Sequence, residues 1–329
     1  MSIDIQQVRQ DLAPLDLSAP TETSKAVAEY LDFYQINFAK TIDGVEHSLG
    51  TLESPLCSGD ETTLVVHCYK KQDAQRTCLV VHGFTDHVGI YRKLISYLLH
   101  RGCNVVCFDL PGHGLSHGEP LHVADFSDYV DALKTVAAFC RSRLKTPWHL
   151  IGQSMGGAIS MDYLLTSQFD DNSVAFEKVV LLAPLVRPAG WRGIRVANFL
   201  LSPLLSSVKR GFSSSSGDQE FLRFQREDDV LQAKRIPTTW VKAMIRWVRR
   251  YKKLSWLDHP VLVVQGLKDE TVDFQYGLKL LQQKFPKARV ITIQEARHHL
   301  VCETDALFER VTQAADIYFE RREKPRDPG

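Results

Sequence analysis

The sequence predicts an α/β protein whose central, mostly parallel sheet is covered by helices on both faces. Short segments that are apolar throughout, such as 77–83 and 260–266, alternate with segments of helical periodicity along most of the 329 residues. Strands without polar alternation are typical of parallel sheets that are buried on both sides. Sites in such sheets lie beyond the carboxyl ends of the strands. The residues that follow each strand are therefore the first place to look for function.

Each expected element follows from its local pattern. The strands are short apolar runs, and the helices repeat apolar residues every three or four positions. The helix at 91–102 ends at Gly102, a residue type that commonly ends helices. In chain order we expect strands at 62–70, 77–83, 104–114, 148–152, 177–184, 260–266 and 288–294, and helices at 23–38, 91–102, 125–144, 155–166, 274–285 and 305–322.

The alternation of strands and helices is interrupted once, and this suggests a division of the chain. We expect an N-terminal leader at 1–45, a core at 46–185 and 257–322, and a flexible tail at 323–329. The interruption at 186–256 follows the strand at 177–184, so we expect it to form a helical cap over the site. Within it, the polar segment 210–218 is predicted to be flexible.

Two surfaces of this cap each have two interpretations. In 238–253, basic residues oppose an apolar face and form either a solvated face or a contact with anionic lipid headgroups. The apolar string 196–205, with Trp191, Trp240 and Trp247, either lines an acyl-chain tunnel or docks the cap on the core. The basic residues are Lys242, Arg246, Arg249, Arg250 and Lys253, and the apolar ones are Val241, Met244, Ile245 and Val248.

The overall composition is that of an ordinary globular protein. Hydrophobic residues make up 44% and charged residues 24%, and the net charge of +1 argues against a nucleic-acid partner. The seven cysteines form no C-x-x-C pair, and the first residues contain no apolar run. These features favour reduced thiols, no secretory signal and a cytoplasmic location. The sequence gives no indication of the oligomeric state.

Chemistry is suggested first by a serine between glycines, in the stretch from His149 to Ser160. There a strand leads through Gly152, Ser154 and Gly156 directly into a helix. A serine hydroxyl is a weak nucleophile, and a tight strand-to-helix turn would project it above the sheet. Glycines on either side allow that turn because larger side chains would collide. We expect Ser154 to be a nucleophile.

A base and an acid follow at later strand ends, in the order Ser, Asp, His of the α/β-hydrolase arrangement. His298 is the candidate general base, and the adjacent His299 is its rival. Asp269 is the candidate that orients the imidazole, and Glu270 and Asp273 are near enough to compete. Backbone N–H groups should meet the oxyanion. The candidates are Met155, directly after the serine, and Phe84, after the strand at 77–83.

The motifs "VVHGFTDHVGIYRKL", "FDLPGHGLSHGEP", "IGQSMGGAIS", "VLVVQGLKDETVD" and "EARHHLVCE" resemble those of the α/β-hydrolase superfamily. More narrowly, they resemble the lysophospholipase and monoacylglycerol-lipase group, which is classed with serine aminopeptidase S33-type domains. The resemblance runs from about Leu64 to the last helix. It implies the same roles for Ser154, Asp269, His298 and Phe84. Family members often read "HGxGEH" where this chain has Thr85 and Asp86, so we expect a bulkier loop there.

We therefore expect a serine hydrolase that cleaves carboxylic esters through an acyl-enzyme. A lysophospholipid or monoacylglycerol is the substrate that the resemblance implies, with no cofactor. No histidine or cysteine spacing suggests a metal site. One alternative is an aminopeptidase or amidase, which would need an acidic pair in the cap to hold the substrate amine. Another is a non-catalytic binding protein on a hydrolase scaffold. The acidic candidates are Glu220, Glu227, Asp228 and Asp229.

Overall fold

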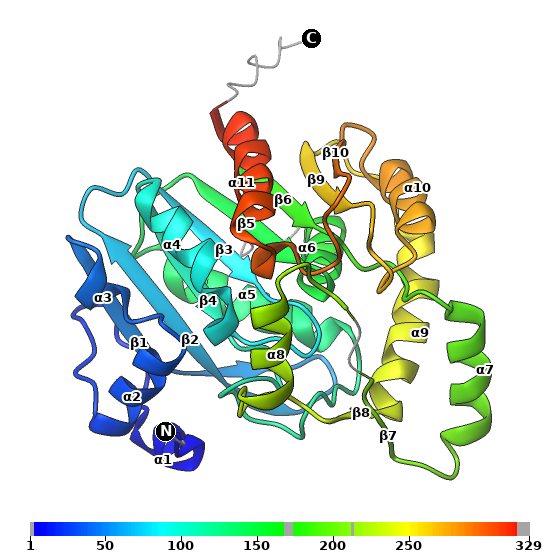
Figure 1. The fold of residues 1–329 in the computed structure, drawn as a ribbon, viewed down its shortest axis with the longest axis horizontal. Coiled ribbons are helices and arrows are strands. Elements are labelled where there is room, and N and C mark those ends of the chain that lie inside the picture. Colours follow the sequence, from blue (N-terminus) through cyan, green and yellow to red (C-terminus); the bar gives the residue numbers. More distant parts are fainter. Residues whose placement is uncertain (1–2, 168–173, 212–213, 321–329) are drawn as a thin grey trace.

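The fold is organised around an eight-stranded sheet in the order β1-β2-β4-β3-β5-β6-β9-β10 (Figure 1). The structure is a computed structural model that describes residues 3–167, 174–211 and 214–320. From β4 to β10 the neighbouring strands are parallel, whereas β1 and β2 pair antiparallel and β2 is antiparallel to β4. The bounds are β1 Val45–Pro55, β2 Glu61–Lys71, β3 Arg76–Val81, β4 Cys103–Phe108, β5 Trp148–Gln153, β6 Lys178–Leu182, β9 Val261–Gly266 and β10 Arg289–Ile293.

Each inner strand buries both of its faces, as the apolar segments predicted. In β3, Leu79 and Val81 belong to one apolar cluster, while Cys78 and Val80 belong to the other. Successive side chains of a strand point to opposite faces, so the sheet separates two cores. The first core contains α5 (Ser127–Arg141), α6 (Met155–Thr166) and α10 (Phe274–Lys284), and the second contains α4 (Arg92–His100) and α11 (Asp305–Glu320).

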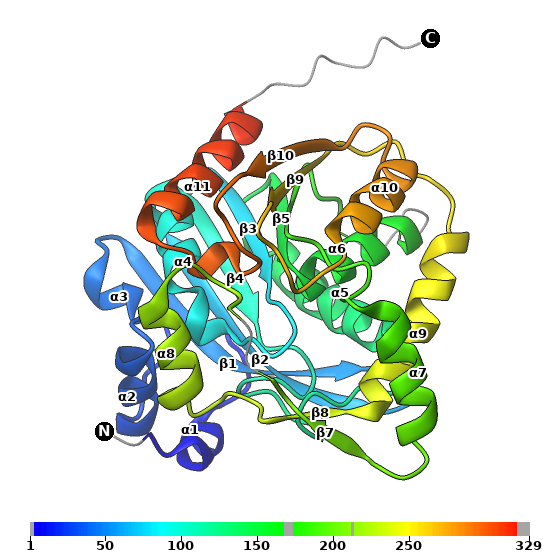
Figure 2. The same cartoon turned by 45° about the vertical axis from the view of Figure 1, so that its right-hand side comes forward.

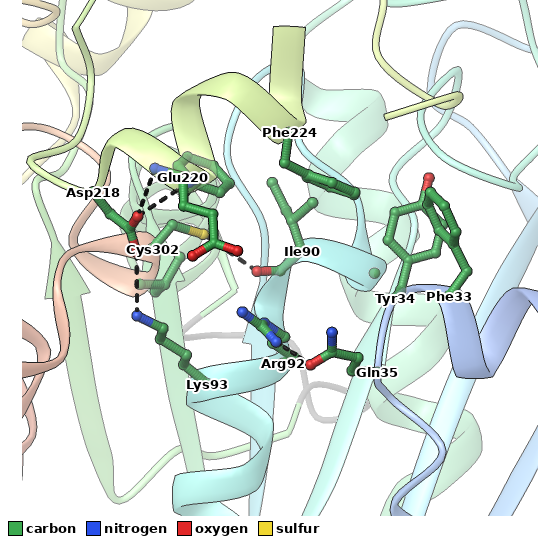
Figure 3. Close-up of a pocket in the computed structure, with 13 residues that line it drawn as sticks. Phe33, Tyr34, Gln35, Ile90, Arg92, Lys93, Asp218, Glu220, Phe224 and Cys302 are labelled. Atoms are coloured by element: carbon green, nitrogen blue, oxygen red, sulfur yellow. Dashed lines mark hydrogen bonds and ion pairs between the residues drawn. The ribbon is translucent and has the colours of Figure 1, made fainter. Parts of the chain in front are cut away.

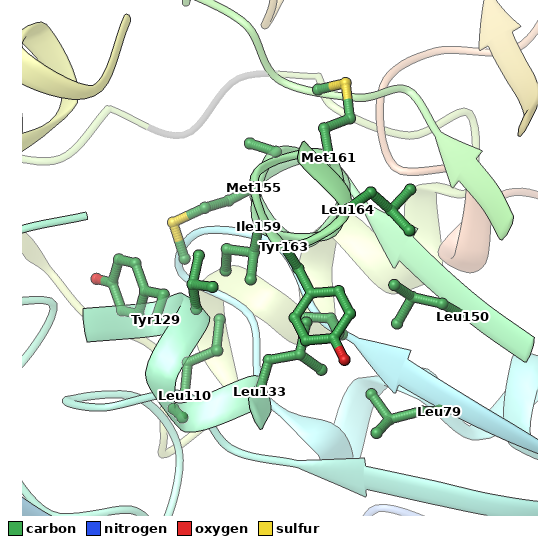
Figure 4. Close-up of a cluster of buried hydrophobic side chains, with 14 of the residues drawn as sticks. Leu79, Leu110, Tyr129, Leu133, Leu150, Met155, Ile159, Met161, Tyr163 and Leu164 are labelled. Carbon is green, nitrogen blue, oxygen red and sulfur yellow. The ribbon is translucent and has the colours of Figure 1, made fainter. Parts of the chain in front are cut away.

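Helix α6 lies at the centre of the first core. Every residue from Met155 to Leu165 is buried, so this helix has no solvent-exposed face. Figure 4 shows Ile159 and Leu164 among side chains from β3, β5 and α5. The helix that follows the candidate nucleophile is therefore held by packing on several sides, which fixes its first turn.

The N-terminal part of the chain contains three elements that the sequence did not predict, namely strand β1 and helices α1 and α3. Strand β1 pairs with β2 along its whole length, from Val45 opposite Lys71 to Pro55 opposite Glu61. Helix α1 (Ile5–Asp11) precedes the predicted helix, which is shorter than expected as α2 (Lys25–Phe33), and a short helix α3 (Phe38–Thr41) follows. Val8, Tyr30 and Leu31 are buried in the second core, so the leader packs against the body of the protein.

The segment between β6 and β9 contains α7 (Trp191–Leu201), α8 (Gln219–Glu227) and α9 (Thr238–Lys253). It also contains an unpredicted antiparallel ribbon, β7 (Ser207–Lys209) with β8 (Arg235–Pro237). Helix α8 lies beside α2 and α4, whereas α7 and α9 lie together on the side of α10 (Figures 1 and 2). No helix in the described ranges is long and apolar enough to span a membrane. The predicted tail, 323–329, lies outside the described residues.

Candidate active site

Residues that follow four strands converge at one edge of the sheet. Phe84 follows β3, Ser154 follows β5, Asp269 follows β9 and His298 follows β10. These strands and β6 between them are mutually parallel neighbours, so their carboxyl ends lie along the same edge. The structure therefore brings together the residues that the sequence placed at separate strand ends.

Ser154 occupies a tight turn between β5 and α6. Its φ of +53° is uncommon for a residue other than glycine and is typical of functional turns. A Cβ atom at Gly152 would lie 2.4 Å from the carbonyl oxygen of Gly156, and one at Gly156 would lie 2.0 Å from that of Val81. Only glycine fits at both positions, because backbone atoms fill the space that a side chain would need.

His298 contacts both the serine and the aspartate. Its Nδ1 lies 2.8 Å from Asp269 Oδ2, and its Nε2 lies 2.8 Å from Ser154 Oγ. A carboxylate only accepts, so Nδ1 carries the hydrogen and Nε2 of the neutral ring can accept from the serine hydroxyl. All three residues are buried, with Ser154 7% exposed. This is the geometry that a serine nucleophile and its general base require.

The Asp269 carboxylate is fixed by several donors. Its Oδ1 accepts from the N–H groups of Thr271 at 2.9 Å and Val272 at 3.1 Å, and Gln265 Nε2 donates to its Oδ2 at 3.0 Å. Burial alone would raise the pKa of Asp269, but the neighbouring His298 and these hydrogen bonds lower it. The group therefore stays a carboxylate and can stabilise an imidazolium.

The other acids near Asp269 have different surroundings. Glu270 is exposed. Asp273 accepts from the Arg187 guanidinium at 2.6 and 2.9 Å and caps α10 through the Tyr276 N–H at 3.2 Å. Within the described residues, neither acid forms a hydrogen bond or ion pair with His298. The sequence did not single out two buried glutamines beside these loops. Gln265 donates to the Asp269 carboxylate, and Gln153 Nε2 donates to His298 O at 2.9 Å. Each side chain therefore helps to hold one of the two loops in place.

The rival histidine points elsewhere. His299 Nε2 donates to Asp86 Oδ1 at 3.0 Å, and its backbone N–H donates to Ser215 O at 2.7 Å. Ser216, in the same polar segment, is buried and donates to Cys302 O at 2.8 Å. The described part of 210–218 around Ser215 and Ser216 is therefore hydrogen-bonded to the histidine loop.

The two N–H groups expected to meet an oxyanion belong to segments on either side of Ser154. Met155 is the first residue of α6, so its N–H has no acceptor within the helix. Phe84 follows Gly83, where an added Cβ would lie 3.3 Å from Ser154 Cβ, so this loop rests directly on the serine. Both segments thus lie directly beside Ser154.

Helix α9 covers this region and docks through two tryptophans. The Trp240 ring stacks on the Phe84 ring with 3.8 Å between centroids. Trp247 Nε1 donates to Asp162 Oδ2 at 3.1 Å, deep in the first core. Arg250 also pairs with Asp162, and Arg246 lies 3.6 Å from Asp125. The basic face of α9 is therefore not purely solvated. Arg246 and Arg250, two of its five basic residues, join the helix to the core.

The apolar string 196–205 neither lines a tunnel nor docks on the core. Phe199 is 78% exposed and Leu204 80% exposed, and Val196, Leu200, Leu201 and Leu205 are exposed as well. The string thus forms an apolar surface on α7 and the turn after it. Both interpretations from the sequence are wrong for this string, while the tryptophans do pack inward.

Two hollows border the loops around the site. A groove of about 860 Å³ runs between the 112–121 loop and β7–β8 and reaches Thr85 and Asp86. A smaller cavity of about 140 Å³ lies between the end of α2, the start of α4 and α8 (Figure 3). Its lining includes Phe224, Glu220 and Cys302 but neither Ser154 nor His298. The larger groove adjoins the Phe84 loop through Thr85 and Asp86, but its lining also includes neither Ser154 nor His298.

The acidic candidates for holding a substrate amine are not gathered at the site. Glu220, Glu227 and Asp228 are exposed on or beside α8. The buried Asp229 carboxylate accepts from Tyr34 Oη at 2.8 Å and from His87 Nε2 at 3.2 Å. Burial would raise the pKa of Asp229, yet His87 and its other donors lower it. This acid ties the insertion to the leader and core.

One group of side chains within the described ranges could hold a metal ion by spacing. Ligand atoms of Cys57, Asp128 and Asp131 lie within 4.8 Å of one another. The Cys57 thiol donates to Asp128 at 3.1 Å, and burial and these carboxylates raise the pKa of the thiol to about 12. Metals bind thiolates, so the group fits a hydrogen-bonded loop better than a metal site.

Comparisons with known proteins show which sequences this chain resembles. Residues 72–305 match the pattern of a protein family described as serine aminopeptidase, S33. The monoglyceride lipase homolog of monkeypox virus is 25% identical over 254 residues, which cover 74% of this chain and 89% of the relative. Phospholipase YtpA of Bacillus subtilis is 25% identical over 209 residues, which cover 59% of this chain and 76% of the relative.

A solved structure supports the fold. A soluble variant of monoglyceride lipase from Saccharomyces cerevisiae superposes with a TM-score of 0.68 at 18% identity, covering 79% of this chain and 92% of that chain. Together with the strand order, this likeness confirms the predicted α/β-hydrolase fold with its mostly parallel sheet.

Proposed function

The chain belongs to the serine aminopeptidase S33 family, and from that premise we propose that it is a lipase-type carboxylic ester hydrolase with Ser154, His298 and Asp269 as its catalytic triad. The observation that carries this proposal is the pair of 2.8 Å contacts that His298 makes with Ser154 Oγ and Asp269 Oδ2. The relatives named as a monoglyceride lipase homolog and a phospholipase support a monoacylglycerol or lysophospholipid as substrate.

The mechanism follows from the positions of these groups. Ser154 Oγ attacks the acyl carbon while His298 Nε2 takes its proton, and the oxyanion is met by the N–H groups of Phe84 and Met155. His298 then protonates the leaving alcohol, and water repeats the cycle on the acyl-enzyme.

The aminopeptidase alternative makes a different prediction about substrates. An amine would need free carboxylates near Ser154, and Asp229 is already bound by Tyr34 and His87. We expect turnover of monooleoylglycerol or lysophosphatidylcholine, much slower turnover of leucine p-nitroanilide, and none by Ser154→Ala. Preference for the anilide would favour the aminopeptidase. No turnover of any substrate by the wild type would favour a non-catalytic binding protein.

We also propose that the protein is cytoplasmic and meets an anionic membrane surface through the insertion. The seven cysteines are all free thiols. The exposed apolar string 196–205 is flanked by exposed Arg192 and Arg195, and Lys242, Arg249 and Lys253 of α9 are exposed. Apolar side chains beside basic ones are typical of surfaces that lie in a lipid interface. This supports peripheral contact in which the apolar string joins the basic residues.

Co-sedimentation with vesicles of phosphatidylcholine and phosphatidylglycerol tests the contact. The double variant Phe199→Ser, Leu204→Ser should lose binding at low salt. Ile317→Ser, a matched change of an exposed apolar residue on α11 that is 57% exposed, should bind like the wild type. Absence of wild-type binding, or equal binding by both variants, would contradict the proposed surface.

A further inference from the structure

A second buried aspartate–histidine pair lies beside the site and is formed by Asp86 and His299. His299 Nε2 donates to Asp86 Oδ1 at 3.0 Å, and the side chains are 6% and 4% exposed. Asp86 belongs to the loop after β3, and His299 directly follows His298 after β10. The pair therefore joins the loop that contains Phe84 to the loop that contains His298.

Asp86 also fixes the loop in which it lies. Its N–H donates to Gly83 O at 3.2 Å, which closes a four-residue turn. Its Oδ2 accepts from the Gly83 N–H at 3.2 Å and from the Tyr91 hydroxyl at 2.9 Å. The turn that contains the Phe84 N–H is thus held at both ends by contacts to Asp86.

One residue of this turn has a side chain that disfavours the backbone conformation of the turn. Thr85, the third residue of the turn, has a φ of +67°. A β-branched residue rarely adopts a positive φ, and glycine is the usual residue at such a position. Backbone of this kind persists only where surrounding contacts hold it. The contacts of Asp86 hold this turn, together with the Trp240 ring on Phe84 and the Tyr91 hydroxyl, which accepts from the Gly83 N–H at 2.9 Å.

We propose that Asp86 and His299 are positioning residues that hold the strained turn 83–86 against Ser154, so that the Phe84 N–H meets the oxyanion. The inference rests on the proposed function. Burial alone would raise the pKa of Asp86 and lower that of His299, but their mutual attraction reverses both shifts and keeps the pair ionised. The insertion supports His299 through Ser215 O and the Phe221 ring, whose centroid lies 5.1 Å from the imidazole.

The test is a double-mutant cycle on kcat and KM for a p-nitrophenyl ester, with wild type, His299→Gln, Thr85→Gly and the double variant. His299→Gln should lower kcat roughly 10- to 100-fold and change KM less than about 3-fold, because a displaced oxyanion donor weakens only the transition state. Thr85→Gly removes the strain of the positive φ at this position. In the Thr85→Gly background the same change should therefore lower kcat less than about 5-fold.

Tyr34→Phe is the matched control, because it removes a hydrogen bond to a buried carboxylate, that of Asp229, and leaves every contact of Asp86 in place. It should lower the melting temperature but not kcat, and adding Thr85→Gly should not change that result. An equal kcat loss for His299→Gln in both backgrounds, or no loss at all in an active enzyme, would overturn the positioning role. A wild type that neither turns over esters nor reacts with a serine-directed phosphonate ester would overturn the proposed function and this inference together.

Discussion

His298 and His299 are neighbours in one loop, each is 5% exposed and each is paired with a buried aspartate, yet they have different surroundings. His298 uses Nδ1 for Asp269 and presents Nε2 to Ser154 Oγ. His299 uses Nε2 for Asp86, and its other neighbour is the buried Cys302 thiol rather than a serine hydroxyl. An aspartate partner and burial do not make a histidine a base; a hydroxyl within reach of its free nitrogen does.

The electrostatics of the two pairs reinforce this difference. Burial would lower the pKa of His299, but Asp86 raises it well above the ordinary value. A histidine that stays protonated cannot accept the serine proton, so His299 is unsuited to act as a base. Together the pairs suggest a division of labour in which one histidine moves protons and the other holds a loop.

The largest expected effect comes from removing the reacting groups of the first pair. Ser154→Ala and His298→Gln should each lower kcat by about 10⁴- to 10⁶-fold, the range found for other triads. Rates of p-nitrophenyl ester hydrolysis measure this loss, and His299→Gln serves as the comparison because it should lose far less. Equal losses for the two histidine variants would remove the distinction between the pairs.

Changing the acid of the first pair should have the next largest effect. Asp269→Asn keeps the size of the side chain but stops fixing the His298 tautomer, so kcat should fall by about 10³- to 10⁴-fold. Asp273→Asn is the control, since its carboxylate binds Arg187 rather than His298. A smaller loss of kcat for Asp269→Asn than for Asp273→Asn would show that Asp269 is not the acid that orients His298.

The second pair should be visible in stability against pH. His299→Gln leaves the Asp86 carboxylate buried without its cation, which should cost about 3 kcal/mol of unfolding free energy. The cost should be largest between about pH 4 and 6.5, the ordinary pKa values of the two groups. It should shrink as the pH rises through the raised pKa of His299, or falls toward the lowered pKa of Asp86.

Urea unfolding of wild type and His299→Gln across this pH range measures the difference. Above pH 6.5 the folded wild type retains a proton that the unfolded chain loses, so its stability falls as the pH rises. Below pH 4 the unfolded chain takes up a proton that folded Asp86 resists, so stability falls with decreasing pH. A stability difference independent of pH would show that the pair is not ionised in the folded protein.

The smallest expected effect concerns a third pair, Asp229 and His87, which forms no hydrogen bond with Ser154, His298 or Asp269 within the described residues. Tyr34→Phe removes one donor to Asp229, at 2.8 Å, and should cost about 1 kcal/mol of unfolding free energy. Asp229 keeps its contacts with His87 and Gln232, so the fold should persist. Thermal unfolding measures the loss. A Tyr34→Phe protein as stable as the wild type would mean that water replaces the Tyr34 hydroxyl as the donor to Asp229.

Much of the core could be predicted because its signals are local. Apolar runs mark the buried parallel strands, and Gly152, Ser154 and Gly156 mark the turn into α6. Strand β1 was missed because "VEHSLGTLESP" is mixed in character, and its pairing with β2 supplies what its composition does not. The same holds for the leader, whose few buried apolar side chains become meaningful only against the second core.

Side-chain partners far apart in the sequence could not be predicted. The departure "HGFTDH" drew attention to Thr85 and Asp86, but nothing local shows that Asp86 meets a histidine 213 positions later. Likewise, an apolar string such as 196–205 reads the same whether it faces a tunnel, the core or solvent. Tertiary packing determines which partner a side chain meets and whether it is exposed, and the periodicity of a sequence contains no information about that packing.

The central claim, that Ser154 carries the acyl group during ester hydrolysis, is tested most directly by trapping that intermediate. Wild type mixed rapidly with p-nitrophenyl decanoate, quenched in acid and mapped by mass spectrometry should carry one decanoyl group on Ser154, formed in a burst of p-nitrophenol. Ser154→Ala should show neither the burst nor the group. Undiminished turnover by Ser154→Ala, or a decanoyl group on another residue of the wild type, would contradict the account.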